Sequence, residues 1–483
     1  MRAFLLTLVF STFTLFASNL RNDSIVKISA TLKEYDYSAP WSPPETSNIF
    51  ASGFIIEGNQ IITNAHAVNN ASFIQVRSSS SNELFEARVK VIGHDCDLAL
   101  LEVEDPMFFE DKNPLKFKGT LLQQREEVEV VGFPMGGIEL SVTKGIVSRS
   151  EITPYVHSMV SLLSTQIDAP INPGNSGGPV FSGDEVVGIA HQGMNGGQNI
   201  GYMIPIPIIR HFLEEIEKGT YEGFPGGALK VQQIQSSAMR KYYGLEKNVG
   251  ALLVIKIPEK HFFHDILKPG DILLEIDGHV IDTYGQIKDE ELNLSLPYSY
   301  LITKKHFGDE VTLRVIRGEG EIELSTFMDP KKKGTDIVSA EFDKSPTYYI
   351  AGGLVFQPLV LDGFRDIIDL RSGIEEGFHY LGGESVKDKD EIIVLSRILK
   401  DAANLGYHEI SKKIVEKVNG KAIRNMRELI ETIETLSDPF LFIETADHIE
   451  IILEREATLE RTPKILNRYF ISSDRSADLQ QSR

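Results

Sequence analysis

One serine of this chain lies in a run of small residues that could make it a nucleophile. Ser176 stands within residues 171–179, Ile-Asn-Pro-Gly-Asn-Ser-Gly-Gly-Pro, where little side-chain bulk crowds its hydroxyl. Glycine before the serine lets the backbone turn consecutive N–H groups toward one point. Two such groups form an oxyanion hole, usually the largest electrostatic contribution to acyl transfer. The same string could be a plain tight turn, so catalysis requires matching residues elsewhere in the chain.

Two further segments supply the base and the carboxylate that a nucleophilic serine requires. His66 follows an apolar strand-like run, in a turn of small residues, and Asp97 opens another apolar run. Asp95 competes for the carboxylate role, but Asp97 directly abuts the apolar residues. A buried aspartate without a partner would be costly, so His66 is the expected partner. The chain order His66, Asp97, Ser176 is that of chymotrypsin-type double barrels, not of subtilisin or α/β-hydrolases.

Together these segments resemble the HtrA/Deg family of PDZ-bearing serine proteases. The matching blocks are Thr-Asn-Ala-His (63–66), Asp-Leu-Ala-Leu-Leu (97–101) and Gly-Asn-Ser-Gly-Gly-Pro (174–179), with 130–134, 142–148 and 349–356. The resemblance is strongest over residues 24–218, and within the family it is closest to the plant-type and bacterial Deg branch. It implies a mainly β fold, with a chymotrypsin-like double β-barrel protease domain of two six-stranded barrels followed by two PDZ-like α/β domains.

The resemblance also implies an activity, that of an ATP-independent serine endopeptidase acting on unfolded or damaged proteins and peptides. Ser176 would attack the scissile carbonyl, His66 would carry the proton and Asp97 would fix the imidazole tautomer. The N–H groups of Gly174 and Ser176 would hold the oxyanion, with the Asn175 peptide shaping the loop. No cofactor and no metal are expected. Family members form trimers that build larger assemblies, so a homo-oligomer is expected.

A peptide-binding chaperone with weak or silenced proteolysis is the alternative function. The intact His66, Asp97 and Ser176 argue against loss of activity, although not against regulated silence. A scaffold built on PDZ domains is a weaker alternative.

Substrate specificity is indicated by the strand that includes Ile200, Gly201 and Met203. In the family this strand lines the S1 pocket, which accepts the residue before the scissile bond. Because Ile200 and Met203 are apolar and no aspartate lies there, a small or medium apolar residue is expected. Membership of both side chains in the barrel core is the alternative.

The length of 483 residues suggests about three domains. Residues 207–218 have the pattern of a helix, with Pro207 in the first turn and Gly219 at the stop, which would close the protease domain. Residues 268–278 and 308–318 resemble PDZ blocks. The predicted organisation is a signal peptide at 1–17, a trypsin-like protease domain at 24–218, a PDZ domain at 226–330, a PDZ-like domain at 345–456 and a polar, partly disordered tail at 457–483.

The first PDZ domain is expected to bind peptide C-termini. A PDZ domain extends its sheet with the peptide strand and captures the terminal carboxylate with backbone N–H groups. The candidate carboxylate loop consists of Gly226, Gly227, Ala228 and Leu229, ahead of a strand at 230–234, and an ordinary interdomain turn is the alternative. In the second PDZ-like domain no Lys-Pro-Gly-Asp block precedes the corresponding strand, so peptide binding there stays open.

The composition argues against nucleic-acid binding, and the N-terminal residues indicate export. With 49 basic and 69 acidic residues the net charge is −20, and no basic stripe indicates nucleic-acid binding. The single Cys96 excludes an internal disulfide and is interpreted as a packing residue. Residues 1–17 indicate a signal peptide, and hence an exported, soluble protein, most simply a periplasmic one. An uncleaved membrane anchor is one alternative, although the apolar segment falls short of the ~20 residues that a span needs. An organellar transit peptide is a less favoured alternative, because such peptides are Arg-rich and amphipathic.

Overall fold

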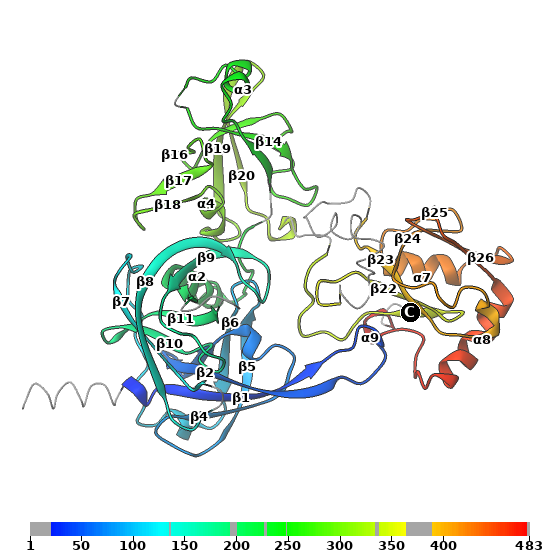
Figure 1. Cartoon of the computed structure of the whole chain (residues 1–483), viewed down its shortest axis with the longest axis horizontal. Helices are drawn as coiled ribbons and strands as arrows, with labels where there is room; N and C mark the ends of the chain where they lie inside the picture. Colours follow the sequence, from blue (N-terminus) through cyan, green and yellow to red (C-terminus); the bar gives the residue numbers. More distant parts are fainter. Residues whose placement is uncertain are drawn as a thin grey trace, which may run out of the picture. The chain divides into compact units, whose positions relative to one another are not determined.

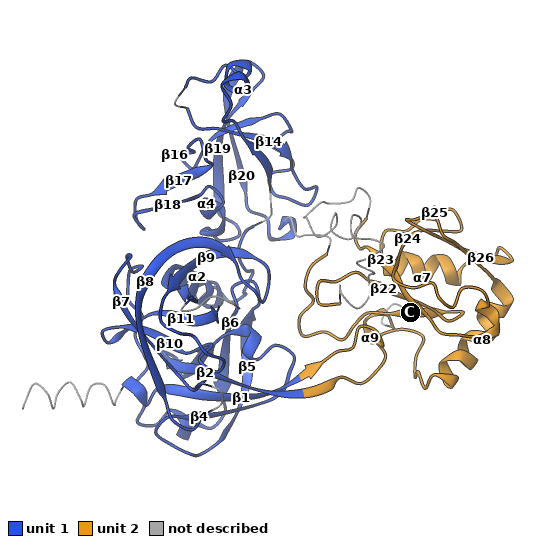
Figure 2. Ribbon diagram, viewed as in Figure 1, with its two compact units in different colours: residues 1–32, 47–333 blue, residues 33–46, 334–483 orange. Residues whose placement is uncertain are grey.

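The computed structural model describes residues 21–134, 137–193, 200–226, 229–247, 249–333, 338–363 and 389–480. The expected signal peptide therefore lies outside the described residues. The chain divides into two compact units, of which unit 1 comprises Met1–Leu32 and Ser47–Lys333 and unit 2 comprises Lys33–Thr46 and Gly334–Arg483 (Figure 2). Within the described part of the chain, no helix combines the length and the apolar character that crossing a membrane requires.

The first part of unit 1 consists of two closed six-stranded antiparallel barrels (Figure 1), as the family resemblance predicted. The first has the strand order β1-β2-β3-β6-β5-β4 and the second β10-β11-β12-β9-β8-β7. Their strands are β1 (Ile25–Glu34), β2 (Glu45–Ile56), β3 (Gln60–Thr63), β4 (Ala71–Ser78), β5 (Phe85–Gly93), β6 (Leu98–Val103), β7 (Glu127–Gly132), β8 (Ser141–Pro154), β9 (Ser161–Ile167), β10 (Pro179–Ser182), β11 (Glu185–Gly193) and β12 (Gly201–Pro205). Short 3-10 helices lie at η1 (Ala65–Ala67) and η2 (Pro106–Phe109).

Each barrel closes around its own apolar interior. Alternate residues of a strand point to opposite faces, so one apolar set fills the barrel while the other set faces outward. In β1, for example, Ile28 and Ala30 are buried while their neighbours are partly exposed. The interior of the first barrel is built from such residues of all six strands, and Val130, Val147, Ile167 and other small apolar residues fill the second.

Helix α2 (Ile206–Glu217) follows directly on the second barrel. Pro207 stands in its first turn, where the missing N–H costs no intrahelical bond, and Gly219 follows its end with a φ of 103°. Ile208, Ile209 and Phe212 are buried, which is the apolar face that the sequence predicted.

The remainder of unit 1 is a small α/β domain. Its main sheet has the order β13-β14-β15-β19-β20, with β16 paired to β15 and a separate β17–β18 hairpin. The elements are β13 (Lys230–Gln233), α3 (Ser237–Tyr242), β14 (Leu252–Lys256), β15 (Ile272–Ile276), β16 (His279–Val280), β17 (Gln286–Asp289), β18 (Leu294–Pro297), α4 (Tyr300–Thr303), β19 (Glu310–Arg317), β20 (Gly320–Phe327) and η4 (Pro330–Lys332). Strand β13 is an edge strand with three exposed residues out of four.

Unit 2 contains a second α/β domain of similar plan, with the sheet order β21-β22-β23-β24-β26-β27 and β25 paired to β24. Its elements are β21 (Tyr349–Ala351), β22 (Leu354–Pro358), β23 (Ile393–Ile398), η5 (Ala402–Asn404), β24 (Lys413–Val418), β25 (Lys421–Ala422), α7 (Met426–Glu434), β26 (Phe440–Thr445), β27 (Glu450–Glu454), α8 (Arg455–Arg468) and α9 (Ala477–Gln480). Asn425 caps α7 by accepting a hydrogen bond from the Glu428 N–H at 2.9 Å.

The prediction of a polar tail after residue 456 is wrong for residues 457–480. Helix α8 follows β27 without a break, and the buried side chains of Ile465, Ile471 and Leu479 anchor this region to unit 2. Asp474 accepts a hydrogen bond from the Ile350 N–H at 2.7 Å through its carbonyl, and Tyr348 accepts one from Ser476 at 3.1 Å. Polar composition concealed these residues because their few apolar side chains are widely spaced, without the regular pattern that indicates a buried face.

The tip of the β1–β2 hairpin belongs to unit 2, although both of its strands begin or end in the first barrel (Figure 2). The Gln357 side chain donates to the Tyr37 carbonyl at 3.0 Å, and Arg397 donates to the Ser38 carbonyl at 2.8 Å. The Trp41 ring packs edge-on against Tyr348, with 6.2 Å between ring centroids. This hairpin therefore contributes to the packing of the C-terminal domain.

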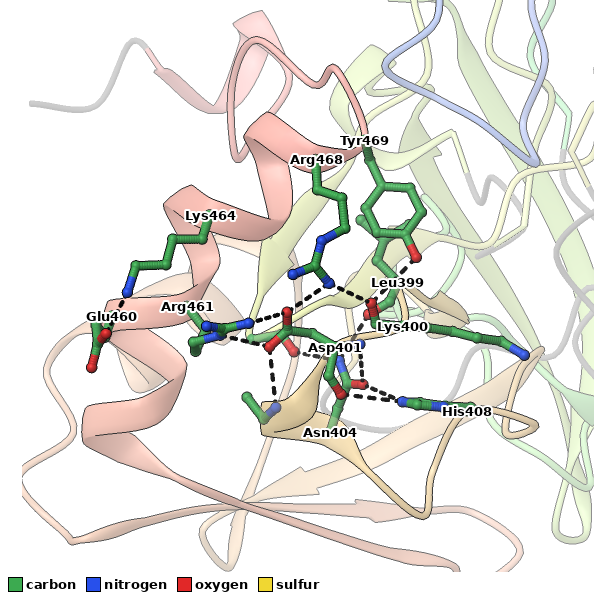
Figure 3. Close-up of polar contacts among 12 residues, drawn as sticks. Leu399, Lys400, Asp401, Asn404, His408, Glu460, Arg461, Lys464, Arg468 and Tyr469 are labelled. Atoms are coloured by element: carbon green, nitrogen blue, oxygen red, sulfur yellow. Dashed lines mark hydrogen bonds and ion pairs between the residues drawn. The ribbon is translucent and has the colours of Figure 1, made fainter.

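A buried aspartate holds α8 against the rest of unit 2 (Figure 3). The Asp401 side chain is fully buried, caps η5, and accepts hydrogen bonds from Arg461 at 2.7 and 2.6 Å. Arg468 adds an ion pair at 2.9 Å. The hydrogen bonds from Arg461 hold the pKa of Asp401 well below its ordinary value. Because that pKa is lowered, the stabilisation is present at neutral pH and is lost only in acid.

Substitution of Asp401 is expected to loosen α8. Asp401→Asn keeps a capping side chain but removes the charge that pairs with both arginines, so hydrogen exchange across residues 455–468 should become roughly tenfold faster at pH 7. Hydrogen-exchange mass spectrometry of the full chain measures this. The matched control is Lys464→Ala, which removes an exposed pair with Glu460 and should change exchange by less than about twofold. Equal effects of the two substitutions would contradict the role of Asp401.

Candidate active site

Strand pairing in the first barrel brings the candidate base and carboxylate together. His66 lies on η1, just after β3, and Asp97 lies in the turn that precedes β6. Because β3 pairs antiparallel with β6, with Thr63 opposite Ala99, the end of one strand meets the beginning of the other. The two carboxylate oxygens of Asp97 contact His66 twice, accepting from its backbone N–H at 2.7 Å and from Nδ1 at 2.7 Å.

The buried carboxylate and the imidazole shift each other's pKa. Asp97 has no exposed surface, and burial alone would raise its pKa. The charge of His66 and the hydrogen bonds from His191 and His66 outweigh burial and hold the pKa of Asp97 well below its ordinary value. For His66 the opposing effects run the other way, because burial lowers the pKa while the charge of Asp97 and the hydrogen bond raise it by more. The Asn64 amide also fixes this turn, donating to the Asp97 carbonyl at 3.0 Å.

The candidate nucleophile lies in the loop between β9 and β10. Gly174 and Gly177 have φ values of 98° and 81°, which glycine adopts without strain. A Cβ at Gly177 would come within 2.2 Å of the Ser52 carbonyl oxygen, so close approach of the first barrel requires glycine here. The Ser176 hydroxyl donates to the His191 carbonyl at 3.3 Å, and no hydrogen bond joins it to His66 among the described residues.

The same loop leaves two backbone N–H groups available. Within the described residues, the N–H groups of Gly174 and Ser176 have no hydrogen-bond partner, whereas the Asn175 N–H donates to the Asn172 carbonyl at 2.9 Å. The first two are the groups that the sequence assigned to the oxyanion, and the third closes the turn around them. This arrangement can accept a negatively charged oxygen beside the Ser176 hydroxyl.

Ser52 braces this loop from the first barrel, a role that sequence reasoning missed. Its hydroxyl donates to the Gly174 carbonyl at 2.7 Å and accepts from the Phe133 N–H at 2.8 Å, and its own N–H donates to the Ser176 carbonyl at 2.9 Å. Thr63 donates to the Ser52 carbonyl at 2.8 Å. The only signal in the sequence is a hydroxyl residue at the start of the apolar part of β2.

The alternative carboxylate, Asp95, is engaged elsewhere. It accepts from the Tyr221 hydroxyl at 2.5 Å and from the Phe224 N–H at 2.9 Å, and thereby ties the segment after α2 to the turn that holds Asp97. Cys96 is buried beside it, with Sγ 3.3 Å from the Tyr221 hydroxyl. Of the two aspartates, Asp97 alone has its side chain hydrogen-bonded to His66 in the described structure.

Comparison with known proteins agrees with this geometry. Residues 51–189 match the trypsin-like peptidase domain, and residues 337–478 match the PDZ domain. The chain is 35% identical to the putative protease Do-like 3, mitochondrial, of Arabidopsis thaliana, over 96% of this chain and 81% of that protein. It is 34% identical to the chloroplastic protease Do-like 2 of the same plant, over 95% and 75% of the two chains. The chain belongs to the Do-like, or HtrA/Deg, family of serine proteases.

More distant relatives and solved structures are consistent with this family. A serine protease DegP homolog of Plasmodium falciparum (isolate 3D7) is 29% identical, over 85% of this chain and 58% of that protein. An HtrA-type protease, AlgW, solved with a tripeptide, has the same fold over 65% of this chain and 95% of its own, with a TM-score of 0.50 and 20% identity. This HtrA/Deg chain is thus a serine endopeptidase with a trypsin-like domain and PDZ domains.

The residues expected to line the S1 pocket of the protease divide between surface and core. Ile200 is half-buried and Gly201 is buried at the start of β12. Met203 has no exposed surface and packs in the interior of the second barrel, against which a Cβ on Gly188 would clash. The Met203 side chain therefore belongs to the core, the alternative that the sequence left open, because its strand position points into the barrel.

The two PDZ sheets of the protease differ at their edges. In the candidate carboxylate loop, Gly227 and Ala228 lie outside the described residues, Gly226 is half-buried and Leu229 is buried. The strand after it, β13, is the edge strand of its sheet. In unit 2, β24 with its partner β25 corresponds to β15 with β16, so the strand that corresponds to β13 is β22. The outer edge of β22 pairs with β21, which itself forms an antiparallel bridge from Tyr349 to Arg475.

Among the described residues, two groups of side chains bring three metal-type donor atoms within 4.8 Å of one another. They are His66, Asp97 and His191, and His211, Glu215 and His306. In the first group Asp97 is joined to both histidines by hydrogen bonds of 2.7 Å, and in the second His306 and Glu215 are joined at 2.5 Å. Two ligands of one zinc ion would be about 3.3 Å apart in tetrahedral geometry. The observed distances are those of hydrogen bonds, so no metal is assigned to either group.

The acid limb of the pH–rate profile is expected to reflect the Asp97–His66 pair. Proton acceptance requires neutral His66, so kcat/KM should rise with pH through an apparent pKa above the ordinary value of about 6.5. In Asp97→Asn the charge that raises this pKa is gone while burial remains, so the limb should move to lower pH. kcat should also fall by roughly 10⁴-fold, since the tautomer is no longer fixed. Profiles of a fluorogenic peptide substrate measure both, with Asp95→Asn as the matched variant of the neighbouring carboxylate. A limb that stays in place in Asp97→Asn would contradict the assignment.

Proposed function

We propose that His66, Asp97 and Ser176 are the catalytic triad of this serine endopeptidase. The observation that carries the proposal is the 2.7 Å hydrogen bond from His66 Nδ1 to a fully buried Asp97 carboxylate. It keeps the proton on Nδ1 and leaves the Nε2 lone pair to accept the Ser176 proton. As Ser176 attacks the scissile carbonyl, His66 becomes an imidazolium, and it then passes the proton to the leaving amine. The N–H groups of Gly174 and Ser176 hold the oxyanion, and water completes the cycle by hydrolysing the acyl-enzyme.

The protease requires a side-chain movement before reaction. The Ser176 hydroxyl donates to the His191 carbonyl, so it must turn toward His66 to lose its proton there. We infer that the present orientation of the Ser176 hydroxyl is a resting conformation. A loop movement or the binding of a peptide then shifts it to the reactive conformation. Hydrogen bonds at catalytic sites commonly tighten only when substrate binds.

Unfolded or damaged proteins are the proposed substrates, with a small or medium apolar residue before the scissile bond. The proposed subsite residues are Ile200 and Gly201, because the Met203 side chain lies in the core. Peptide C-termini are proposed to bind the first PDZ domain along its edge strand β13, with residues 226–229 as the carboxylate loop. In the second PDZ domain the corresponding strand β22 is already flanked by β21, so that domain is proposed to serve packing and assembly.

The proposed assembly is a homo-oligomer, either a trimer or a multiple of trimers, on the basis of the family resemblance alone. Residues 1–17 are proposed to direct export and to be removed from the mature chain. The Arabidopsis relatives are named mitochondrial or chloroplastic, which makes delivery to an organelle the alternative for this segment.

Removal of the proposed nucleophile should abolish proteolysis. Ser176→Ala is expected to lower the rate of casein cleavage by roughly 10⁶-fold and to eliminate labelling by a fluorophosphonate probe, because the acyl-enzyme and the probe adduct both form on the Ser176 hydroxyl oxygen. Both are measured on purified full-length chain, with and without an apolar C-terminal peptide. Stimulation by the peptide would support regulation through the first PDZ domain.

The outcome also separates the two candidate functions. Equal, negligible cleavage and labelling in the parent and in Ser176→Ala, with aggregation of a model substrate still suppressed, would reject the triad proposal and favour a peptide-binding chaperone. Ser79→Ala is the matched control, because the Ser79 hydroxyl donates to the Asn22 carbonyl at 2.6 Å and lies outside the proposed site.

A further inference from the structure

His191 contacts two of the three proposed triad residues. It lies on β11 of the second barrel, with 3% of its surface exposed. Its Nδ1 lies 2.7 Å from Asp97 Oδ2, the same oxygen that accepts from His66 Nδ1. Its backbone carbonyl accepts the hydrogen bond from Ser176 at 3.3 Å. Two imidazoles therefore share one carboxylate oxygen, and one of them belongs to no role assigned so far.

The hydrogen-bond pattern fixes the tautomer of His191. The ionised Asp97 carboxylate can only accept, so Nδ1 of His191 carries a proton. The other ring nitrogen, Nε2, is buried and has no hydrogen-bond partner among the described residues. His191 therefore acts on Asp97 as a donor through its Nδ1–H.

The ring is also held in a fixed orientation. The Tyr155 ring lies 4.6 Å from it, and Tyr155 itself is fully buried with its hydroxyl donating to the Leu163 carbonyl at 2.7 Å. The centroid of the His66 ring lies 6.4 Å from that of His191. Because both neighbours come from packed elements, the Nδ1–H bond is preorganised rather than formed on substrate binding.

We propose that His191 is a positioning residue of the active site, whose Nδ1–H holds the Asp97 carboxylate in place for His66. This inference rests on the proposed triad and goes beyond it. The donor comes from the second barrel, whereas Asp97 and His66 come from the first, so the contact also fixes the carboxylate relative to the Ser176 loop.

The contact has a consequence for the charge on His66. A donor to Asp97 disperses part of the carboxylate's negative charge, and its removal leaves more of that charge acting on His66. The titratable groups that face His66 are Asp97, His191 and His157, whose ring lies 6.3 Å from it, with His94 hydrogen-bonded behind His157 at 3.0 Å. Among the described residues, only the side chains of His66 and His191 in this group form hydrogen bonds with the Asp97 side chain.

Three substitutions separate the donor from the ring. His191→Phe keeps a ring of similar size without a donor. His191→Asn places an amide at the position of Nδ1, whereas His191→Gln places one at the position of Nε2. We expect His191→Phe and His191→Gln to lower kcat by roughly 10- to 100-fold, with KM changed less than about twofold. In His191→Asn, kcat should stay within about threefold of the parent value. The acid limb of the kcat/KM profile should move to higher pH in His191→Phe and should lie at the position of the parent protein in His191→Asn.

A turnover-independent readout keeps the test separate from the proposed function. Selective ¹³C-histidine NMR of the full chain follows the titration of His66 directly, and His191→Phe should raise its midpoint. The positioning role would be overturned if the parent and His191→Phe had the same kcat, the same acid limb of kcat/KM and the same titration midpoint of His66. Equal losses of kcat in His191→Phe, His191→Asn and His191→Gln would also overturn it. If the parent and Ser176→Ala are equally inactive, the triad proposal fails, while an unshifted or shifted His66 midpoint still decides the His191–Asp97 contact.

Discussion

The buried charge of Asp97 is the interaction on which the geometry of the site depends. A carboxylate without exposed surface must be matched by donors, since an unpaired buried charge would be costly. Its two oxygens accept from the backbone and side chain of His66 and from the side chain of His191. Those donors come from η1 in the first barrel and β11 in the second. The charge of Asp97 therefore connects η1 with β11, two segments of different barrels that no strand pairing links.

The nucleophile loop depends on the first barrel in a complementary way. Ser52 exchanges hydrogen bonds with the carbonyls and N–H groups around Ser176, and the backbone of β2 approaches so closely that a side chain at Gly177 would clash. A Cβ on Gly178 would likewise meet the Val131 carbonyl oxygen at 2.4 Å. The glycines after Ser176 are thus required by close packing, against the first barrel at Gly177 and against β7 of the second barrel at Gly178. Access to the Ser176 hydroxyl is a second consequence of these small residues.

The two PDZ domains illustrate how similar sheets acquire different roles. Both place a short strand at one edge of an antiparallel sheet. In unit 1 β13 is the last strand of its sheet, whereas in unit 2 the corresponding strand β22 is flanked by β21, which is bridged in turn to the segment between α8 and α9. An open edge offers backbone groups to an extended peptide, and an occupied edge does not. The fold of each domain is set by its apolar pattern, while the edge of β22 is occupied by an additional strand of the same chain.

The sequence by itself determined the protease fold and the three triad candidates. Short alternating strands indicate barrels, Pro207 and Gly219 bound a helix, and the small-residue segments around His66 and Ser176 are local signals that survive without any knowledge of contacts. These features are readable because each depends on neighbours in the chain.

Only the tertiary structure decided the rest. It placed Met203 in the core, folded residues 457–480 into unit 2, and brought Ser52 and His191 to the site. His191 and Asp97 are 94 residues apart, and Ser52 and Gly174 are 122 apart. Contacts over such separations depend on how the two barrels close and pack, and a single polar residue at each end leaves no periodicity or spacing from which they could be inferred.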